Sequence, residues 1–334
     1  MSNSSNASMK KTTLGPSGIA CSAIGLGTWA MGGWMWGGGD NAAAVLAIHA
    51  SLDAGVTLID TAPAYGLGRS ESIVGTALKG RRQEAVVATK CGLVWHTQKG
   101  THFFEEDGHP VHRHLGRESI FHECEESLKR LQTDYIDLYI THWQDSTTPV
   151  EETMGALLDL KKQGKIRAIG VSNVSPETLA EYLRYGPVDA AQERYSLIDR
   201  EIEQTLVPLC AQHDVAVLGY SSLALGLLAG PIDPARQFTG DDQRAANPRF
   251  SAENRAKLKA FFEELEPLRQ HLECSFGQLM IAWTLARGSV QVALCGARVS
   301  RQATENAGAG AVQLRDDALA LIDAAAGRHL HALA

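Results

Sequence analysis

The sequence has few of the features that mark membrane, secreted or nucleic-acid-binding proteins. In 334 residues no stretch approaches the ~20 consecutive apolar residues that cross a bilayer. Residues 1–13 are rich in Ser and Asn and have no apolar core of a secretory signal, so we expect no export. No block of basic residues occurs, and 31 Lys and Arg face 38 Asp and Glu. We therefore expect neither a membrane nor a nucleic acid as partner.

Cysteine is sparse and unpatterned. The six cysteines are scattered and include no C-x-x-C pair. In a chain of this length, that predicts reduced, individually packed thiols and a cytoplasmic location. The hydrophobic fraction of 44% is ordinary for a globular protein and excludes a disordered or fibrous chain.

Short apolar segments alternate with amphipathic ones along the chain. The apolar segments predict strands at 21–27, 56–60, 85–90, 135–142, 166–172, 188–192, 215–221 and 290–296. The amphipathic segments predict helices at 41–54, 70–79, 117–131, 150–163, 176–185, 201–213 and 275–286. The predicted strands are continuously apolar, which is typical of parallel strands covered on both faces.

Eight predicted strands that alternate with helices, without a change of composition, predict one parallel α/β domain. Their number and the length of about 300 residues favour a closed (β/α)₈ TIM barrel, with a doubly wound sheet as the alternative. We expect this domain over 10–330 and a flexible tail over 1–9. Two long segments interrupt the rhythm, at 97–116 and 230–250, and long loops in a barrel are usually functional or disordered.

Polar residues end three successive predicted strands. These residues are Asp60, Lys90 and His142, and Tyr65 follows in the turn after Asp60. Neighbouring strands lie about 4.8 Å apart, so their carboxyl ends would bring the four side chains together. Singly, Asp60 could cap a helix and Lys90 could form an ordinary ion pair. The four together favour a catalytic site.

This set of residues suits proton transfer to a carbonyl oxygen. A free tyrosine has a pKa near 10 and is a poor acid or base at neutral pH. We expect the Lys90 ammonium to lower the pKa of Tyr65, and Asp60 to keep Lys90 charged. His142 would donate a hydrogen bond to the same oxygen.

The segments that contain these residues resemble the aldo-keto reductase family, over about residues 10 to 330. The four residues match the family's catalytic tetrad without substitution. The opening GTWAMGGW at 27–34 resembles a bacterial branch with glycerol dehydrogenases and glyceraldehyde reductases. The segments that carry the resemblance are DTA (60–62), YG (65–66), ATK (88–90), DLYITHW (137–143), GVSN (170–173), QERY (192–195), GYSSL (219–223) and GAR (296–298).

The resemblance implies NADP(H) as cofactor, bound without a Rossmann fold. Ser172, Asn173 and Gln192 would hold the carboxamide, and Tyr220 would stack on the nicotinamide ring. Arg298 would bind the 2′-phosphate near a helix N-terminus. The other cofactor contacts that it implies are Thr28, Trp29, Ser221, Leu223, Gly226, Gln302, Glu305 and Asn306.

The sequence departs from the family at two places. Cys295 stands where the family commonly has a proline before Gly-Ala-Arg, and this changes at most the stiffness of the loop. Pro231 follows Gly230 where the family commonly has a lysine. This second departure removes a possible charged contact with the cofactor.

Two other patterns are weaker. Gly25-x-Gly27-x-x-Ala30 loosely matches a dinucleotide fingerprint, but the glycine-rich segment 31–39 should not form the helix that a Rossmann turn requires. Six of the twelve histidines lie within 96–122. Without a further Cys or carboxylate at a zinc spacing, we expect no metal and interpret the segment as a solvated loop, with adventitious metal binding or a lid left open.

Four tryptophans fall on predicted loops at the barrel mouth. We expect Trp29, Trp34 and Trp143 to contact the substrate, with Trp36 near them. A small, mostly apolar wall without Lys or Arg suits small aldehydes and polyols such as glyceraldehyde and glycerol. We therefore expect an NADP-dependent oxidoreductase in which Tyr65 is the general acid and base.

Two other functions remain open from the sequence. The first is a redox-sensing or channel-associated subunit that binds cofactor and turns over poorly. The second is a metal-dependent barrel isomerase. An α/β-hydrolase has no nucleophile here, because Gly-x-Ser-x-Gly is absent.

Overall fold

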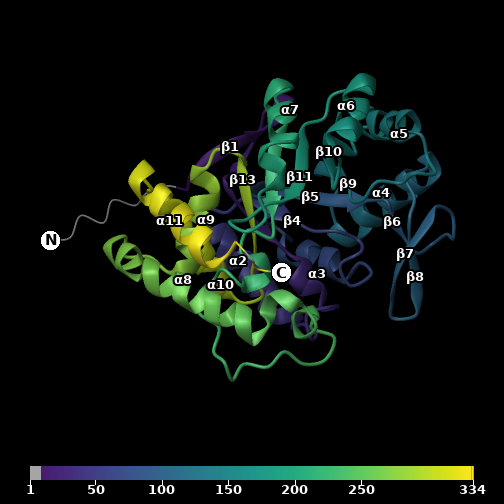
Figure 1. Cartoon of the computed structure of the whole chain (residues 1–334). Helices are drawn as coiled ribbons and strands as arrows, with labels where there is room; N and C mark the ends of the chain where they lie inside the picture. Colours follow the sequence, from purple (N-terminus) through teal and green to yellow (C-terminus); the bar gives the residue numbers. More distant parts are fainter. Residues whose placement is uncertain (1–8, 332, 334) are drawn as a thin grey trace.

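The computed structural model describes residues 9–331 and 333 of the chain. Eight parallel strands close into a barrel in the order β10-β11-β12-β13-β3-β4-β5-β9 (Figure 1). All eight overlap the strands predicted from the sequence, which confirms the (β/α)₈ barrel. The doubly wound alternative is wrong, because the first and last strands of this order, β10 and β9, also pair with each other and close the sheet. The strands are β3 (Ile24–Gly27), β4 (Leu58–Asp60), β5 (Val86–Cys91), β9 (Ile136–Thr141), β10 (Ile166–Ser172), β11 (Ala190–Arg194), β12 (Ala216–Tyr220) and β13 (Val292–Gly296).

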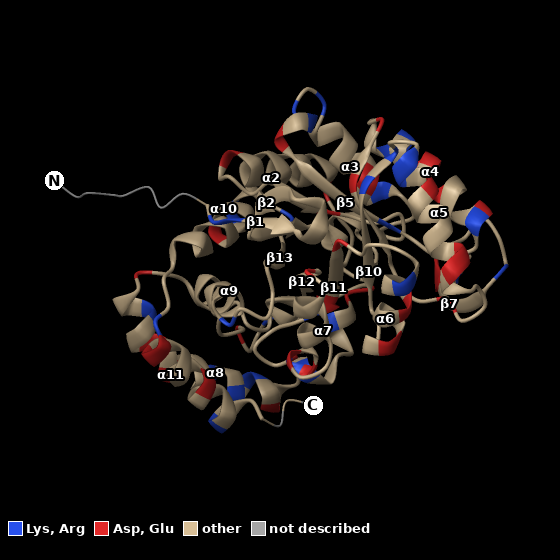
Figure 2. Ribbon diagram, turned by 90° about the horizontal axis from the view of Figure 1, so that it is seen from above, with Lys and Arg blue, Asp and Glu red and all other residues tan. Residues whose placement is uncertain are grey.

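Helices surround the barrel. Figure 2 shows Lys, Arg, Asp and Glu spread in both signs over outer helices such as α4, α5 and α8. The helix at 176–185 begins as predicted, with the Ser175 side chain accepting from the Thr178 N–H. The helices are α2 (Asn41–Asp53), α3 (Arg69–Ala77), α4 (Arg117–Leu131), α5 (Val150–Lys162), α6 (Pro176–Tyr185), α7 (Leu206–Gln212), α8 (Ala252–His271), α9 (Phe276–Ala286), α10 (Ser300–Gly308) and α11 (Asp316–His329).

One predicted helix is shorter than expected. The segment 201–213 consists of a 3₁₀ turn, Glu201–Glu203, followed by α7 from Leu206. Pro208 has no N–H to donate to the preceding turn, and a proline is best tolerated in the first turn of a helix. The α-helix therefore begins just before this proline.

The inner face of the barrel determines which side chains reach its mouth. Side chains of a strand alternate between its two faces, and Leu58, Ala88 and Ala190 belong to the buried cluster inside the barrel. Two positions further along the same strands stand Asp60, Lys90 and Gln192. These three polar side chains therefore point inward at the carboxyl end of the barrel.

An antiparallel hairpin that the sequence did not predict covers the other end. It consists of β1 (Lys11–Leu14) and β2 (Ile19–Ser22), and Leu14 and Cys21 join the inner cluster. Gly15 has a φ of 45°, and a Cβ there would lie 2.4 Å from the carbonyl oxygen of Asp189. Only glycine fits this close approach to the strand.

The predicted tail lies almost wholly outside the described residues. Its last residue, Met9, is the exception, because its side chain packs against the core beside Gly55 and Gly310. All six cysteines are buried and unpaired. In the described part of the chain, no helix has both the length and the apolar character of a membrane span.

The histidine-rich segment is more ordered than a solvated loop. It forms the antiparallel sheet β6-β8-β7, from β6 (Leu93–Val94), β7 (Thr101–Glu106) and β8 (His109–Arg113). Val111 and Leu93 form a small core with Ala64, on which Phe103 and Phe104 pack. Burial of these apolar residues orders the hairpin. In the sequence they stand singly or in pairs among polar residues, so the segment has the composition of a loop.

The glycine-rich segment after β3 contains one helical turn, α1 (Trp29–Gly32). The expectation that 31–39 is non-helical is therefore wrong for Met31 and Gly32. Gly25 and Gly27 lie on barrel strand β3 and the helical turn has only four residues, so no Rossmann unit is present here. The segment 230–250 contains only short 3₁₀ turns before α8, a helix that the sequence did not predict.

Candidate active site

The four residues predicted to act together do meet at the barrel mouth. Lys90 Nζ lies 2.8 and 2.9 Å from the two carboxylate oxygens of Asp60, and 3.2 Å from the Tyr65 hydroxyl. The Lys90 side chain is fully buried and that of Asp60 nearly so. The rings of Tyr65 and His142 stand edge to face, with centroids 5.7 Å apart. An ammonium, a phenol and an imidazole thus line one small space.

The surroundings of Tyr65 correct one expectation. Burial first, and then the nearby Asp60 and Tyr220, raise the pKa of the Tyr65 phenol well above its ordinary value. The prediction that Lys90 lowers the pKa of Tyr65 below its ordinary value is therefore wrong for the cofactor-free protein. The loss of water around the phenolate outweighs the effect of the neighbouring ammonium. Tyr65 is a neutral phenol, and it can donate its proton.

Burial also shifts the pKa of Lys90 and of His142. It lowers the pKa of Lys90, although the Asp60 carboxylate opposes this effect. Burial and the positive charge of Lys90 hold the pKa of His142 well below its ordinary value. His142 is therefore a neutral imidazole at physiological pH, able to donate a hydrogen bond without carrying a charge.

Amide and hydroxyl groups of three adjacent strand ends form a connected network beside this site. Asn173 Nδ2 donates to the His142 carbonyl at 2.8 Å and to Ser172 Oγ at 3.0 Å. Its Oδ1 accepts from the Tyr220 hydroxyl at 2.8 Å. Ser172 Oγ donates to the Gln192 carbonyl at 2.6 Å. The sequence prediction that Ser172, Asn173, Gln192 and Tyr220 lie together is thus met by their positions.

Strained backbone marks the same edge of the barrel. Asn173 and Ser221 have φ values of 54° and 60°, a region that non-glycine residues rarely adopt. The turn after β12 continues with Ala224 and Leu225 at positive φ, and ends at Gly226. Such strain tends to gather at ligand sites, where backbone N–H groups are directed at the ligand.

Thr28 and Trp29 lie at the start of the adjoining loop. Thr28 is fully buried, and its hydroxyl donates to the Asp60 carbonyl at 2.9 Å. Thr28 therefore fastens the end of β4, where Asp60 stands. Trp29 lies over Tyr65, with ring centroids 6.2 Å apart.

Arg298 precedes α10 and faces the loop that carries the tryptophans. Its Nη1 donates to the carbonyl oxygens of Trp36 and Gly38 at 2.9 and 3.0 Å. Gln302 Oε1 accepts from the Arg298 N–H, which fixes the entry into the helix. Glu305 lies on the same helix, 3.9 Å from Arg301.

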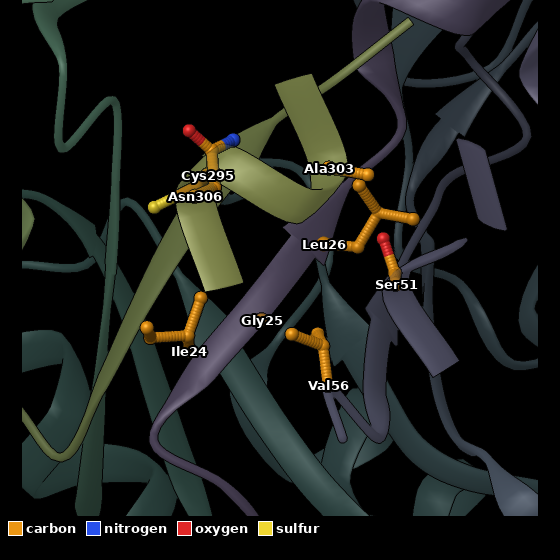
Figure 3. A pocket seen from close by; sticks show the side chains of 8 residues that line it. All are labelled: Ile24, Gly25, Leu26, Ser51, Val56, Cys295, Ala303 and Asn306. Carbon is orange, nitrogen blue, oxygen red and sulfur yellow. The ribbon is translucent and has the colours of Figure 1, made fainter. Parts of the chain in front are cut away.

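Asn306, on α10, lines a small cavity (Figure 3). Its Nδ2 donates to the Gly296 carbonyl at 3.1 Å. The cavity holds about 10 Å³, room for at most one water molecule, and Cys295 lines its wall. Burial raises the pKa of the Cys295 thiol to about 12, so this departure from the family supplies no reactive group.

The aromatic wall contains more residues than the sequence indicated. Trp143 packs against Phe103 with centroids 5.2 Å apart, and Trp34 stacks on Phe104 at 4.9 Å. Trp36 lies against Trp29 at 5.4 Å. Phe103 and Phe104 come from the histidine-rich segment, where this pair of phenylalanines among polar neighbours is the sequence signal for a further part of the wall.

The histidines of that segment come together only in pairs. The rings of His96 and His122 lie 4.3 Å apart, and those of His102 and His112 lie 5.5 Å apart. Within 9–331 and 333, no three His, Cys, Asp or Glu side chains gather as metal ligands.

Comparison with known proteins gives consistent results. Residues 23–326 match the model of the "Aldo/keto reductase family". An Escherichia coli protein named "NADH-specific methylglyoxal reductase" is 42% identical over 314 residues, 92% of this chain and 95% of its own. The structure of glycerol dehydrogenase AKR11B4 from Gluconobacter oxydans is 38% identical, with a TM-score of 0.85 and 97% of both chains covered. An aldo-keto reductase from Klebsiella pneumoniae in complex with NADPH is 30% identical, with a TM-score of 0.72 and 94% of both chains covered.

Proposed function

The chain belongs to the aldo-keto reductase family, and from this premise we propose that it interconverts small aldehydes or ketones and alcohols with NADP(H). One observation carries the proposal: the Tyr65 hydroxyl lies 3.2 Å from Lys90 Nζ, which in turn contacts both oxygens of Asp60. A neutral, positioned phenol beside an ammonium is an acid ready to protonate a developing alkoxide.

Each residue of the tetrad has a separate task. Tyr65 gives its proton to the carbonyl oxygen in reduction and takes it back in oxidation. Lys90 stabilises the phenolate that results, and Asp60 holds Lys90 in place. The neutral His142 orients the carbonyl oxygen by donating a hydrogen bond. The nicotinamide, when bound, supplies or accepts the hydride.

The residues at the mouth fit such a cofactor. Gln192 Oε1 accepts no hydrogen bond from the described residues, so it can take an N–H of a carboxamide. Tyr220 packs on the inner core with its ring fixed through Asn173, as a stacking partner requires. The turn that contains Ser221, Leu223 and Gly226, in which Ser221 and Gly226 have positive φ, would meet the pyrophosphate, with Glu305 and Asn306 at the adenosine.

Arg298 supports NADP(H) as the preferred cofactor. A guanidinium beside a helix N-terminus suits a 2′-phosphate, and Gln302 stands in the first turn of that helix. A cavity of about 440 Å³ lies in the segment 236–255, and its lining includes Arg236, Arg244 and Arg255. The Klebsiella protein was solved with NADPH, whereas the name of the E. coli relative specifies NADH, so cofactor choice needs a direct measurement.

The aromatic wall supports a small substrate. Trp29, Trp34 and Trp143 would enclose it, and their ring N–H groups could each donate one hydrogen bond to a hydroxyl. The Gluconobacter and E. coli relatives are named for glycerol and methylglyoxal, which have three carbons. A cytoplasmic location, where NADP(H) is available, is part of this proposal.

A steady-state assay tests the proposal. We expect the purified protein to reduce glyceraldehyde and methylglyoxal, and to oxidise glycerol, with a higher kcat/KM for NADPH than for NADH. Turnover below about one per minute with every small carbonyl and either cofactor would instead favour a cofactor-binding subunit. Loss of activity on chelation would favour a metal-dependent enzyme.

A further inference from the structure

The amide of Gln192 reaches across the barrel to the tetrad. Gln192 lies on β11 and Asp60 on β4, and these two strands stand opposite each other in the closed ring. Gln192 Nε2 nevertheless donates to Asp60 Oδ2 at 2.7 Å. The two residues are only 2% and 4% exposed. A hydrogen bond to a carboxylate is strong in such a dry place.

This bond acts on the residue that holds Lys90. The Lys90 ammonium has three N–H donors and four acceptors within 3.2 Å: the two oxygens of Asp60, the Thr61 carbonyl and the Tyr65 hydroxyl. Because Asp60 Oδ2 also accepts a hydrogen bond from Gln192, it binds the Lys90 ammonium less strongly. Lys90 is then freer to donate to the Tyr65 hydroxyl. The bond also fixes the plane of the carboxylate, and hence the place of Nζ relative to Tyr65.

We propose that Gln192 is a positioning residue that links the carboxamide subsite to Asp60 and so keeps Lys90 within reach of Tyr65. The proposal rests on the proposed function, since it assigns the free Oε1 of the same amide to the cofactor. The amide oxygen of Gln192 would then contact the carboxamide of the nicotinamide, while the amide nitrogen orients Asp60. A residue that only held the carboxamide would leave Asp60 and Lys90 unaffected when replaced.

The first experiment uses the cofactor-free protein. In protein with ¹³C-labelled lysine, NMR follows the titration of Lys90, whose signal is the one lost in Lys90→Met. Gln192→Met removes the N–H donor from Asp60, so the carboxylate holds the ammonium more strongly and the Lys90 midpoint should rise by roughly half a pH unit or more. An unchanged midpoint would overturn the proposal.

Gln144→Met is the matched control. Gln144 is another glutamine at the mouth, but its amide bonds to Ser172 O and Thr141 Oγ1 and does not touch the tetrad. Its replacement removes a similar group and should leave the Lys90 midpoint unchanged. An equal shift in both variants would mean that general loosening of the mouth moves the midpoint, which would also overturn the proposal.

The second experiment separates the two ends of the amide. Wild type and Gln192→Met are compared with NADPH and with its 3-acetylpyridine analogue, which has no carboxamide N–H. We expect kcat to fall about tenfold or more with both cofactors, in the range for a hydrogen bond to a charged group. A loss seen with NADPH and absent with the analogue would confine Gln192 to the carboxamide.

The third experiment is a rescue by pH. In Gln192→Glu the new carboxyl faces the Asp60 carboxylate, so like charge raises its pKa. When protonated it can donate to Asp60 in place of the amide. We expect kcat relative to wild type to be severalfold higher at pH 5.5 than at pH 8.5, and a pH-independent ratio would contradict the proposal. If the wild type reduces no carbonyl at all, the proposed function fails, while the lysine titration still decides whether Gln192 acts on Lys90.

Discussion

The Arg298 guanidinium donates to the carbonyl oxygen of Trp36 at 2.9 Å, across 262 positions of sequence. On the other edge of the same loop, the Asp241 carboxylate accepts from the N–H groups of Met35 and Gly37 at 2.7 and 2.9 Å. Two charged side chains from separate segments thus hold the loop that carries Trp34 and Trp36. The residue proposed to bind the 2′-phosphate therefore also positions part of the substrate wall.

Arg298→Ala should weaken the binding of both NADPH and the substrate. We expect the Kd for NADPH to rise about 10- to 100-fold and the Kd for NADH to rise far less, because only NADPH has the 2′-phosphate. Since the loop loses an anchor, the KM for glyceraldehyde should also rise. Fluorescence titration and steady-state kinetics measure these effects. Arg301→Ala is the control, because that side chain is 84% exposed; equal losses for both cofactors in Arg298→Ala would exclude the assigned role.

Tyr65→Phe should abolish most turnover. The change removes the phenol but retains the ring against Trp29 and His142. Loss of a positioned acid should lower kcat by about 10²–10⁴-fold with little change in cofactor affinity. Tyr135→Phe removes a hydroxyl just before β9, at the opposite end of that strand from the mouth, and should keep kcat near wild type. A Tyr65→Phe enzyme with near-normal turnover would require another acid.

The pH dependence of the two directions should differ. The raised pKa of Tyr65 keeps the phenol protonated through neutral pH, so the reduction rate should stay level up to about pH 9. Oxidation needs the phenolate, whose fraction rises tenfold with each pH unit below the pKa. His142 is already neutral and should add no inflection near pH 6.5. Single-turnover rates between pH 5.5 and 9.5 test this, and superimposable profiles would contradict it.

Glu106 should destabilise the protein at high pH. Its carboxyl is 1% exposed with an unpaired Oε2, and burial, Asp107 and Asp241 raise its pKa to about 7. The folded state then binds more protons than the unfolded state between about pH 4.5 and 7, so stability falls as pH rises through this window. Glu106→Gln should raise the unfolding free energy at pH 8 by about 1–3 kcal/mol and change little at pH 4.5.

Chemical denaturation at the two pH values measures this effect. Glu105→Gln is the matched control, because its side chain is exposed on the other face of the same strand. No gain at pH 8 in Glu106→Gln would mean that water or a rearranged hairpin satisfies the carboxylate.

The barrel and the tetrad could be predicted because their signals are local. Each strand is a short apolar segment, and Asp60 and Lys90 stand two positions beyond the inward-facing Leu58 and Ala88. Side chains two positions apart on a strand lie on the same face, so the residues that follow the inner core positions also point inward and form the catalytic site. The order of the strands follows from the rule that successive parallel units pack side by side.

Other features depend on partners that are distant in the sequence. The Gln192–Asp60 bond joins opposite strands, and the hairpin at 101–113 is ordered by contacts with Trp34 and Trp143. The pKa of Tyr65 depends on how much water the folded mouth excludes, which no spacing of residues reveals. The net shift of the Tyr65 pKa is therefore opposite to the expected one, because burial outweighs one neighbouring positive charge.

Substrate size should depend on the contact between Trp34 and Phe104. Phe104 projects from the hairpin and stacks on Trp34 at 4.9 Å, so Phe104→Ala removes one side of the wall without touching the tetrad. We expect kcat/KM for a bulky aromatic aldehyde to rise at least severalfold relative to that for glyceraldehyde, since a pocket discriminates by the volume it excludes. Phe121→Ala, on the outer helix α4, is the control for loss of an aromatic ring alone. Sugar phosphates and steroids should remain poorer substrates than glyceraldehyde for the wild type, because the loop 29–36 contains no Lys or Arg and we expect the tryptophans to leave only a small pocket. A wild-type preference for either would show that the substrate lies elsewhere at the mouth.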